Sequence, residues 1–164
     1  MVEILEGNLS KLAEIVRRDL GKEIESVPGT GAAGGLGAGL LGFCDAVLKP
    51  GIDLVLENTN FDEKVKSADL VITGEGKLDS QTFFGKTPVG VSMRALRYNC
   101  PTIAIAGCTV GDLSRLKEKN ILAYFSVVNG IFPEEEIFSN SNKLLENSTE
   151  QVMNIAKIFM GLNK

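Results

Sequence analysis

Residues 68–75 read ADLVITGE, and two further apolar runs follow them: PTIAIAGC at 101–108 and ILAYFSVV at 121–128. Short uninterrupted apolar runs are typical of strands that a parallel sheet buries on both faces. Helical signals separate the runs. Residues 88–99 begin with a proline, which suits the first turn of a helix, and residues 112–119 form a short helical segment. This alternation predicts parallel strand pairing through right-handed crossovers.

The tail from about residue 133 is also predicted to be helical. The three acids at 134–136 suit a first helical turn, where the positive end of the helix dipole favours negative charge. Further on, Ser148 or Thr149 is a candidate N-cap. One apolar face is expected at helical spacing, formed by Val152, Ile155, Ala156, Phe159 and Met160.

From residue 67 to residue 164 the sequence therefore predicts an α/β domain. Its sheet is expected to be parallel and doubly wound, Rossmann-like or flavodoxin-like, with helices on both faces. Residues 1–66 lack the alternation, and we expect a remnant of a second α/β domain there. Within that remnant, a helix is predicted at 8–20, and Gly21 is a good residue just past its end.

Three segments of this first part are harder to assign. The stretch at 28–43 is rich in glycine and alanine, so its first half is expected to be a loop and its second half could be a closely packed helix. Residues 52–59 could form a helix or a strand. Residues 61–67 are predicted to form one or two helical turns.

Composition excludes several classes of protein. Of the 164 residues, 44% are hydrophobic and 23% are charged, which is close to the globular average and excludes disorder. The net charge of −4 argues against nucleic-acid and anionic-membrane partners. No apolar run is long enough to span a bilayer, and the opening MVEILEGN lacks the basic residues of a signal peptide. We therefore expect a cytoplasmic protein.

Histidine and cysteine narrow the chemistry. The chain has no histidine, which excludes Ser-His-Asp and Cys-His nucleophile systems and His-ligated zinc. Proton transfer would then fall to a carboxylate, a lysine, a tyrosine or a thiol. The three cysteines, Cys44, Cys100 and Cys108, have no CxxC spacing, so we expect reduced and mostly buried thiols.

The segment at 73–87, TGEGKLDSQTFFGKT, follows the first predicted strand at its carboxyl end, where open α/β sheets bind ligands. Glu75 and Asp79 are candidates for a general base or a Mg²⁺ ligand. Lys77 and Lys86 could neutralise phosphates. The alternative interpretation is an ordinary solvated loop. The segment also supplies glycines for close backbone approach and neutral hydrogen-bonding side chains: Gly74, Gly76, Gln81 and Thr82.

Two glycine motifs are incomplete matches to nucleotide-binding patterns. Residues 85–87, Gly-Lys-Thr, resemble the end of a P-loop, but Ser80 stands where that pattern needs glycine. Residues 29–34, GTGAAG, fit the letters of a dinucleotide fingerprint, but Pro28 rather than a strand precedes them. Neither a Walker site nor an NAD site is expected. For the second motif, an anion-binding loop and a pure packing role both stay open.

Taken together, PGTGAAGGLG (28–37), DLVITGEGKLDSQTFFGKTPVGV (69–91) and the later AIAG resemble the C-terminal half of the bacterial glycerate kinase family. This family includes the 2-kinases of glycerate catabolism. The resemblance runs from about residue 27 to the helical tail, and its GEGxxDxQTxxGKxPxGV pattern is long and specific. It implies a transferase that moves phosphate from ATP to D-glycerate, with Mg²⁺, in a cleft between two α/β domains.

The resemblance also implies site residues. On the signature segment we expect Asp79, Glu75 and Lys77 to be catalytic. Our hypothesis is that Asp79 or Glu75 orients the glycerate hydroxyl or binds the metal, and that Lys77 or Lys86 neutralises the transferring phosphate. Lys77 stands where the family most often has arginine, which keeps the charge but loses the bidentate fork. The residues expected to bind nucleotide or phosphate are Gly74, Gly76, Gln81, Thr82, Gly85 and Lys86 on the signature segment, and Gly29, Gly31, Gly34 and Gly35 on the glycine-rich loop.

The sequence also departs from the family pattern. The N-terminal P-D-S-F-K type segment and the G-G-S-A-T-N-D-G-G loop are absent, and the chain is less than half the family's usual length. We therefore expect this polypeptide alone to be inactive and to need an N-terminal kinase half as its partner. Exposed sheet edges would favour a homo-oligomer. The alternative is a non-catalytic α/β module that binds anions or a partner, or half of a split kinase.

Overall fold

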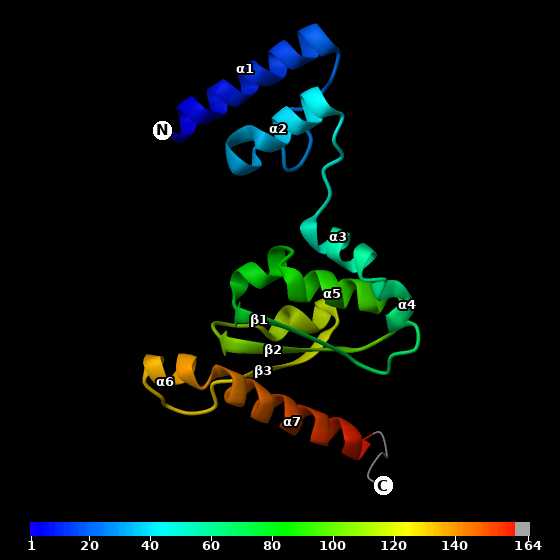
Figure 1. Cartoon of the computed structure of the whole chain (residues 1–164), viewed down its shortest axis with the longest axis vertical. Coiled ribbons are helices and arrows are strands. Elements are labelled where there is room, and N and C mark those ends of the chain that lie inside the picture. Colours follow the sequence, from blue (N-terminus) through cyan, green and yellow to red (C-terminus); the bar gives the residue numbers. More distant parts are fainter. Residues whose placement is uncertain (160–164) are drawn as a thin grey trace. The chain divides into compact units, whose positions relative to one another are not determined.

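The computed structural model describes residues 1–159. They form two compact units, the first at residues 1–50 and the second beginning at Gly51, and Figure 1 shows the helices and strands of each. Residues 51–66 belong to the second unit, in which α3 (Gly51–Asn58) and α4 (Phe61–Val65) precede the sheet. The sequence-based division after residue 66 stays a prediction about the domains of a longer protein.

A parallel three-stranded sheet forms the centre of the second unit. Its strands are β1 (Val71–Leu78), β2 (Thr102–Thr109) and β3 (Ile121–Ser126), in the order β1-β2-β3. The crossovers are α5 (Thr87–Leu96) and the 3₁₀ helix η2 (Ser114–Lys119). Parallel neighbours need such crossovers, so the observed order follows from the alternation of the sequence.

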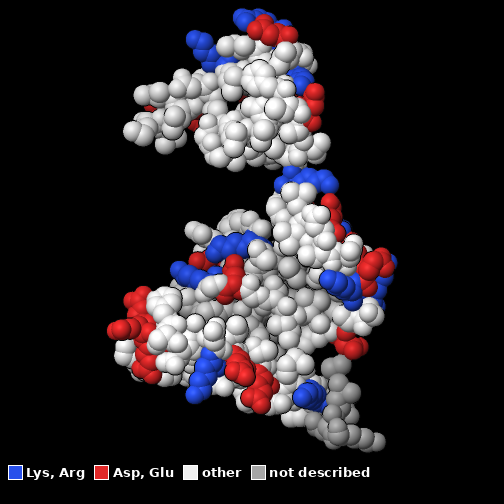
Figure 2. All heavy atoms as spheres, viewed as in Figure 1, with Lys and Arg blue, Asp and Glu red and all other residues white. Residues whose placement is uncertain are grey.

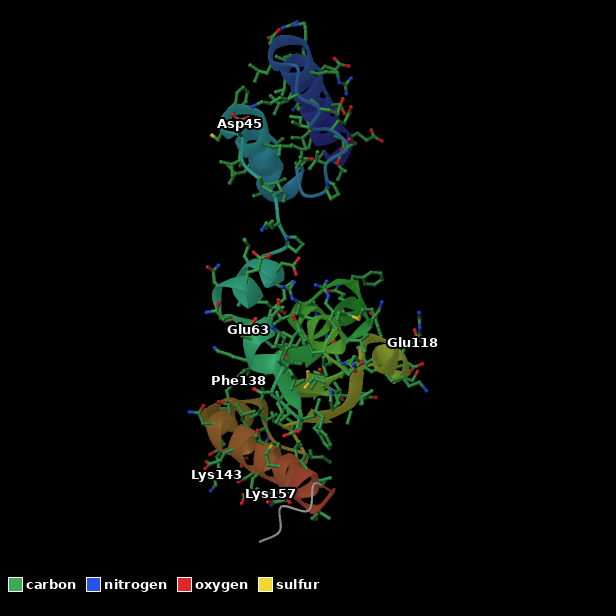
Figure 3. The ribbon with its side chains drawn as sticks, turned by 90° about the vertical axis from the view of Figure 1, so that its right-hand side faces the viewer. Asp45, Glu63, Glu118, Phe138, Lys143 and Lys157 are labelled. Atoms are coloured by element: carbon green, nitrogen blue, oxygen red, sulfur yellow. The ribbon has the colours of Figure 1, made fainter. Side chains whose placement is uncertain are left out.

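Helices cover both faces of this sheet, which confirms the predicted α/β class. On one face, Leu78 of β1 packs with Val89 of α5 and Leu116 of η2. On the other face, Ile105 of β2 packs with Val152 of α7 (Ser141–Phe159). Figure 1 shows α5 and α7 on opposite sides of the strands. The exposed Lys143 and Lys157, labelled in Figure 3, also lie on α7.

The strand predictions hold in number and order but not in burial. We expected a run at 68–75 that is buried on both faces, whereas β1 begins at Val71 and only Val71 and Leu78 are buried along it. Ile72 keeps 40% of its surface exposed. The reason is position, since β1 lies at an edge of the sheet and pairs only with β2.

The tail is helical from Glu134, as predicted. It consists of α6 (Glu134–Ser139) and α7, and the three acids do occupy the first turn of α6. Neither Ser148 nor Thr149 is an N-cap, because both lie inside α7, where the Thr149 hydroxyl donates to the Leu145 carbonyl.

Only part of the apolar face predicted for the tail packs against the sheet. Val152 is buried, Ala156 is half-buried and Ile155 is 49% exposed. Met160 and the side chain of Phe159 lie outside the described residues.

The first unit pairs α1 (Val2–Leu20) with α2 (Ala32–Cys44). The helix predicted at 8–20 starts six residues earlier and ends, as expected, at Gly21 in the left-handed conformation with φ of 68°. Small residues allow the close packing of α2. A Cβ on Gly35 would lie 2.5 Å from a methyl group of Leu9, and one on Gly42 would lie 3.3 Å from Val16.

Two further observations concern the described residues as a whole. None of their helices combines the length and the apolar character that a bilayer crossing requires.

The expectation of mostly buried thiols is wrong for two of the three cysteines. Cys44 and Cys108 are exposed, while Cys100 is buried, and its burial raises the pKa of its thiol. Acidic and basic side chains intermix on the face of the second unit in Figure 2.

Candidate active site at the carboxyl end of strand β1

The signature segment at 73–87 is not a single loop. Strand β1 includes residues 73–75, as expected, and continues through Gly76 and Lys77 to Leu78, so six of the fifteen residues are strand. The 3₁₀ helix η1 (Ser80–Phe84) follows directly, and α5 starts at Thr87. The expected loop was wrong here because pairing with β2 overrides the weak strand propensity of glycine and charged residues.

Close contact with β2 explains two glycines around this strand. A Cβ on Gly74 would lie 2.5 Å from the carbonyl oxygen of Ile105, and one on Gly107 would lie 2.5 Å from the carbonyl oxygen of Gly76. Nothing lies within 4 Å of a Cβ added to Gly76 itself. The structure therefore requires glycine at 74 and 107 for packing, and leaves Gly76 without a packing requirement.

Asp79 caps the 3₁₀ helix that follows the strand. Its Oδ1 accepts the backbone N–H of Gln81 at 3.0 Å, and its own backbone N–H donates to the hydroxyl of Thr82 at 3.1 Å. This reciprocal arrangement is a capping box, which satisfies backbone groups that a helix start leaves unpaired. The Asp-x-x-Thr spacing at 79–82 is the signal in the sequence that corresponds to this cap.

Two lysines flank the same carboxylate. Lys86 Nζ lies 3.2 Å from Asp79 Oδ1, and Lys77 Nζ lies 3.5 Å from Asp79 Oδ2. The hydrogen bond from Lys86, helped by the Gln81 N–H and by Lys77, lowers the pKa of Asp79 below its ordinary value. Asp79 therefore carries a negative charge at neutral pH, and its side chain is only 18% exposed.

The second carboxylate, Glu75, joins this cluster through Thr82. The Thr82 hydroxyl donates to Glu75 Oε1 at 3.0 Å, and Thr82 has no exposed surface. Strand β1, helix η1 and the start of α5 thus bring together five of the predicted site residues. These are Glu75, Lys77, Asp79, Thr82 and Lys86.

The remaining predicted residues of the segment have backbone roles in the structure. Gly85 has φ of 91°, a left-handed conformation that glycine adopts without strain, and it ends η1. Gln81 contributes its N–H to Asp79 and is exposed. Lys86 is the N-cap residue of α5, and Pro88 stands in the first turn, as expected.

The glycine-rich motif of residues 29–34 lies in the first unit. Gly29, Gly34 and Gly35 have φ of 94°, 67° and 92°, so the backbone requires glycine-like freedom there. Gly31 has no such φ, and its added Cβ would meet only Leu9 at 3.9 Å. Packing accounts for Gly35, since Leu9 fills the space that its Cβ would need.

A metal at this site would depend on few protein ligands. Within residues 1–159 no group of three or more acidic or cysteine side chains is placed to hold an ion. Mg²⁺ bound to a nucleotide usually takes only one or two carboxylates, with the phosphates completing its shell. Glu75 and Asp79 fit that requirement, since Thr82 occupies only one oxygen of Glu75 and the Asp79 Oδ2 contact with Lys77 is long.

Comparison with known proteins identifies the family. A family model described as the glycerate kinase family matches residues 1–157. A glycerate kinase of Halalkalibacterium halodurans is 49% identical over 148 residues, which cover 90% of this chain and 39% of that protein. A glycerate 2-kinase of Escherichia coli is 43% identical over 138 residues, which cover 84% of this chain and 36% of that protein.

A solved structure agrees. The crystal structure of a protein assigned as glycerate kinase 2 from Salmonella typhimurium LT2 superposes with a TM-score of 0.72 at 37% identity, covering 93% of this chain and 39% of that one. The chain spans about two fifths of the length of the relatives it matches. It therefore belongs to the glycerate kinase family and corresponds to the C-terminal part of its members.

Proposed function

We propose that this chain supplies the metal- and phosphate-binding part of a glycerate kinase active site, whose complete form transfers phosphate from ATP to a hydroxyl of D-glycerate. The observation that carries the proposal is Asp79, held between Lys86 and Lys77 at the carboxyl end of β1. Phosphoryl transfer asks a protein mainly for positioning and for neutralisation of charge. Two lysines and two carboxylates at one sheet end meet that demand without histidine.

The lysines are proposed to receive the phosphates. In the ligand-free chain Lys86 and Lys77 pair with Asp79, and their side chains keep 34% and 52% of their surface exposed. They can therefore reach a phosphate without unfolding any element. An ammonium group neutralises a phosphate as a point charge, so the replacement of arginine by Lys77 keeps the charge and loses the planar fork.

The carboxylates are proposed to hold the metal and to orient the substrate hydroxyl. Bound Mg²⁺ would neutralise charge on the transferring phosphoryl group, and Glu75 and Asp79 are the residues that would hold it. The lowered pKa of Asp79 makes it a weak base, which favours an orienting or metal-binding role over proton abstraction. Thr82 was expected to bind phosphate, but the proposed function assigns phosphate binding to Lys77 and Lys86 instead.

In the glycine-rich segment, we propose that Gly29 and Gly34 are the glycines that bind phosphate. Both have positive φ, and neither is required by close packing. They are the candidates to present backbone N–H groups to phosphate. Gly31 and Gly35, which were also expected there, have less support, because Leu9 accounts for Gly35 and nothing in the backbone requires glycine at 31.

We also propose that turnover needs the rest of the family's chain, since this one spans about two fifths of its relatives. A coupled ADP-release assay with D-glycerate, Mg²⁺ and ATP tests this on the purified chain. We expect no turnover from the chain alone, a cooperative melt, and binding of Mg·ADP that Asp79→Asn weakens. A folded chain that neither turns over nor binds Mg·ADP would contradict the proposal.

The same short span favours a second candidate, a non-catalytic anion-binding module or one half of a split kinase. Binding of inorganic phosphate distinguishes the anion-binding module from the proposed kinase site. A module that merely binds anions would bind phosphate and Mg·ADP alike and would not depend on Mg²⁺, whereas the proposed site needs the metal. Activity that appears when an N-terminal kinase half is added would identify a split kinase.

A further inference from the structure

We propose that Thr82 is a positioning residue that fixes Glu75 and Asp79 in one arrangement and touches no ligand itself. This inference rests on the function proposed above, because it assigns a role within the same site. It replaces the expectation that Thr82 binds phosphate directly.

The hydroxyl of Thr82 is the physical link between the two carboxylate residues. It donates to Glu75 Oε1 at 3.0 Å and accepts the backbone N–H of Asp79 at 3.1 Å. One of these partners lies in strand β1 and the other at the cap of η1. A single side chain therefore fixes both the rotamer of Glu75 and the capping geometry of Asp79.

Burial separates Thr82 from any ligand. Its exposed fraction is 0%, whereas Gln81 beside it is exposed and Asp79 is partly exposed. A threonine hydroxyl has one proton to donate, and here that proton goes to Glu75. The group has no surface through which a phosphate oxygen could approach, so its effect on a ligand must pass through its two neighbours.

The two negative charges of the site explain why a link between Glu75 and Asp79 is needed. Glu75 and Asp79 are both acidic, and two carboxylates that share a cation have no attraction for one another before it binds. Residues that hold metal ligands in place commonly change metal affinity by about 10–100-fold when they are replaced. A buried hydroxyl that orients the Glu75 carboxylate and holds the backbone N–H of Asp79 fits this class of residue.

The chain offers a matched control. Thr102 on β2 is also fully buried, but its hydroxyl has no hydrogen-bond partner among the described residues. Thr82→Val and Thr102→Val therefore make the same chemical change at equal burial. Only the first removes hydrogen bonds, and Thr82→Ser keeps the hydroxyl as a conservative rescue.

Three-bond NMR couplings of the ligand-free chain test the positioning directly. In the wild-type chain we expect a single side-chain rotamer at Glu75 and at Asp79. Thr82→Val should give averaged couplings at Glu75, whose carboxylate loses the Thr82 hydrogen bond, while Thr82→Ser and Thr102→Val should retain the wild-type values. Averaged couplings in the wild type, or unchanged ones in Thr82→Val, overturn the inference. The wild-type result decides the matter even where Thr82→Val does not fold.

Affinity for Mg·ADP provides the second readout. We expect Thr82→Val to weaken binding by about 10-fold or more, with Thr82→Ser close to wild type. In a Glu75→Gln background the cost of Thr82→Val should shrink, because part of its effect runs through Glu75. An equal cost in both backgrounds overturns the inference. If the wild-type chain does not bind Mg·ADP at all, the proposed function fails, and the couplings alone decide the role of Thr82.

Discussion

Lys86 Nζ lies 3.2 Å from Oδ1 of Asp79, the same carboxylate oxygen that accepts the Gln81 N–H at 3.0 Å. One oxygen therefore caps a helix and pairs with a lysine at the same time. The hydrogen bonds stabilise the fold of the segment, whereas the negative charge is the feature proposed to bind the metal. A substitution that keeps the cap and removes the charge separates the two.

Asp79→Asn is that substitution. Asparagine caps a helix about as well as aspartate, so the melting temperature should stay close to that of the wild type. Mg·ADP affinity should fall by about 10-fold or more, since a proposed metal ligand has lost its charge. Calorimetric titration and a thermal melt measure the two effects on one sample.

Asp112→Asn is the matched control for this experiment. Asp112 Oδ1 accepts the Ser114 N–H at 2.9 Å, which is the same kind of turn at the start of η2, and no lysine among the described residues pairs with Asp112. We expect unchanged Mg·ADP affinity there. Equal effects at 79 and 112 would show that the charge of Asp79 has no special role.

The ion pair between Asp62 and Arg94 predicts a pH-dependent stability. The Arg94 guanidinium donates two hydrogen bonds to Asp62, from Nε and Nη2, and links α4 to α5. It holds the pKa of Asp62 below its ordinary value of 3.8. The stabilisation is therefore fully present above that value and is lost as the pH falls through the lowered pKa of the folded chain. Asp62→Asn should lower the urea midpoint at pH 7, and this effect should shrink as the pH falls below 3.8.

Glu63→Gln serves as the comparison at the neighbouring residue, which is labelled in Figure 3. Glu63 pairs with Lys66 at 2.7 Å, but both side chains are largely exposed. Exposed pairs contribute little to stability, so the urea midpoint should stay at the wild-type value. A midpoint that Asp62→Asn leaves unchanged at pH 7 would refute the importance of the Arg94 pair.

Two glycines of the signature segment should tolerate alanine very differently. Gly74→Ala places a Cβ 2.5 Å from the Ile105 carbonyl oxygen, whereas nothing lies within 4 Å of a Cβ at Gly76. We expect Gly74→Ala to reduce the free energy of unfolding by about 2 kcal/mol or more, and Gly76→Ala to change it by less than about 0.5 kcal/mol. Denaturant unfolding measures both. If Gly76→Ala is stable but binds Mg·ADP poorly, Gly76 contributes to the ligand site.

Thr102→Val should stabilise the chain. The Thr102 hydroxyl is buried on β2 without a hydrogen-bond partner among the described residues. Replacing an unpaired buried hydroxyl with a methyl group of similar shape removes a desolvation cost, so the free energy of unfolding should rise by about 1 kcal/mol. A decrease on denaturant unfolding would mean that the hydroxyl has a partner.

Pattern and chemistry predicted much of this structure. Uninterrupted apolar runs predicted three parallel strands, and Gly21 and Pro88 marked helix ends, because these signals are local. The extension of β1 from Gly76 to Leu78 was not predictable, since it depends on pairing with β2. The burial of Thr82 was not predictable either, because it follows from how η1 folds back beside β1. The sequence predicted which residues at 73–87 belong to the site, but the contacts between them depend on the folded structure.

The most direct test of the account is a titration of the full chain with Mg·ADP, followed by amide chemical shifts. The account predicts saturable shifts that centre on residues 74–87 and weaken in Asp79→Asn. Shifts that leave these residues unchanged, or no binding by a folded chain, would contradict the claim that the carboxyl end of β1 carries the phosphate- and metal-binding part of a kinase site.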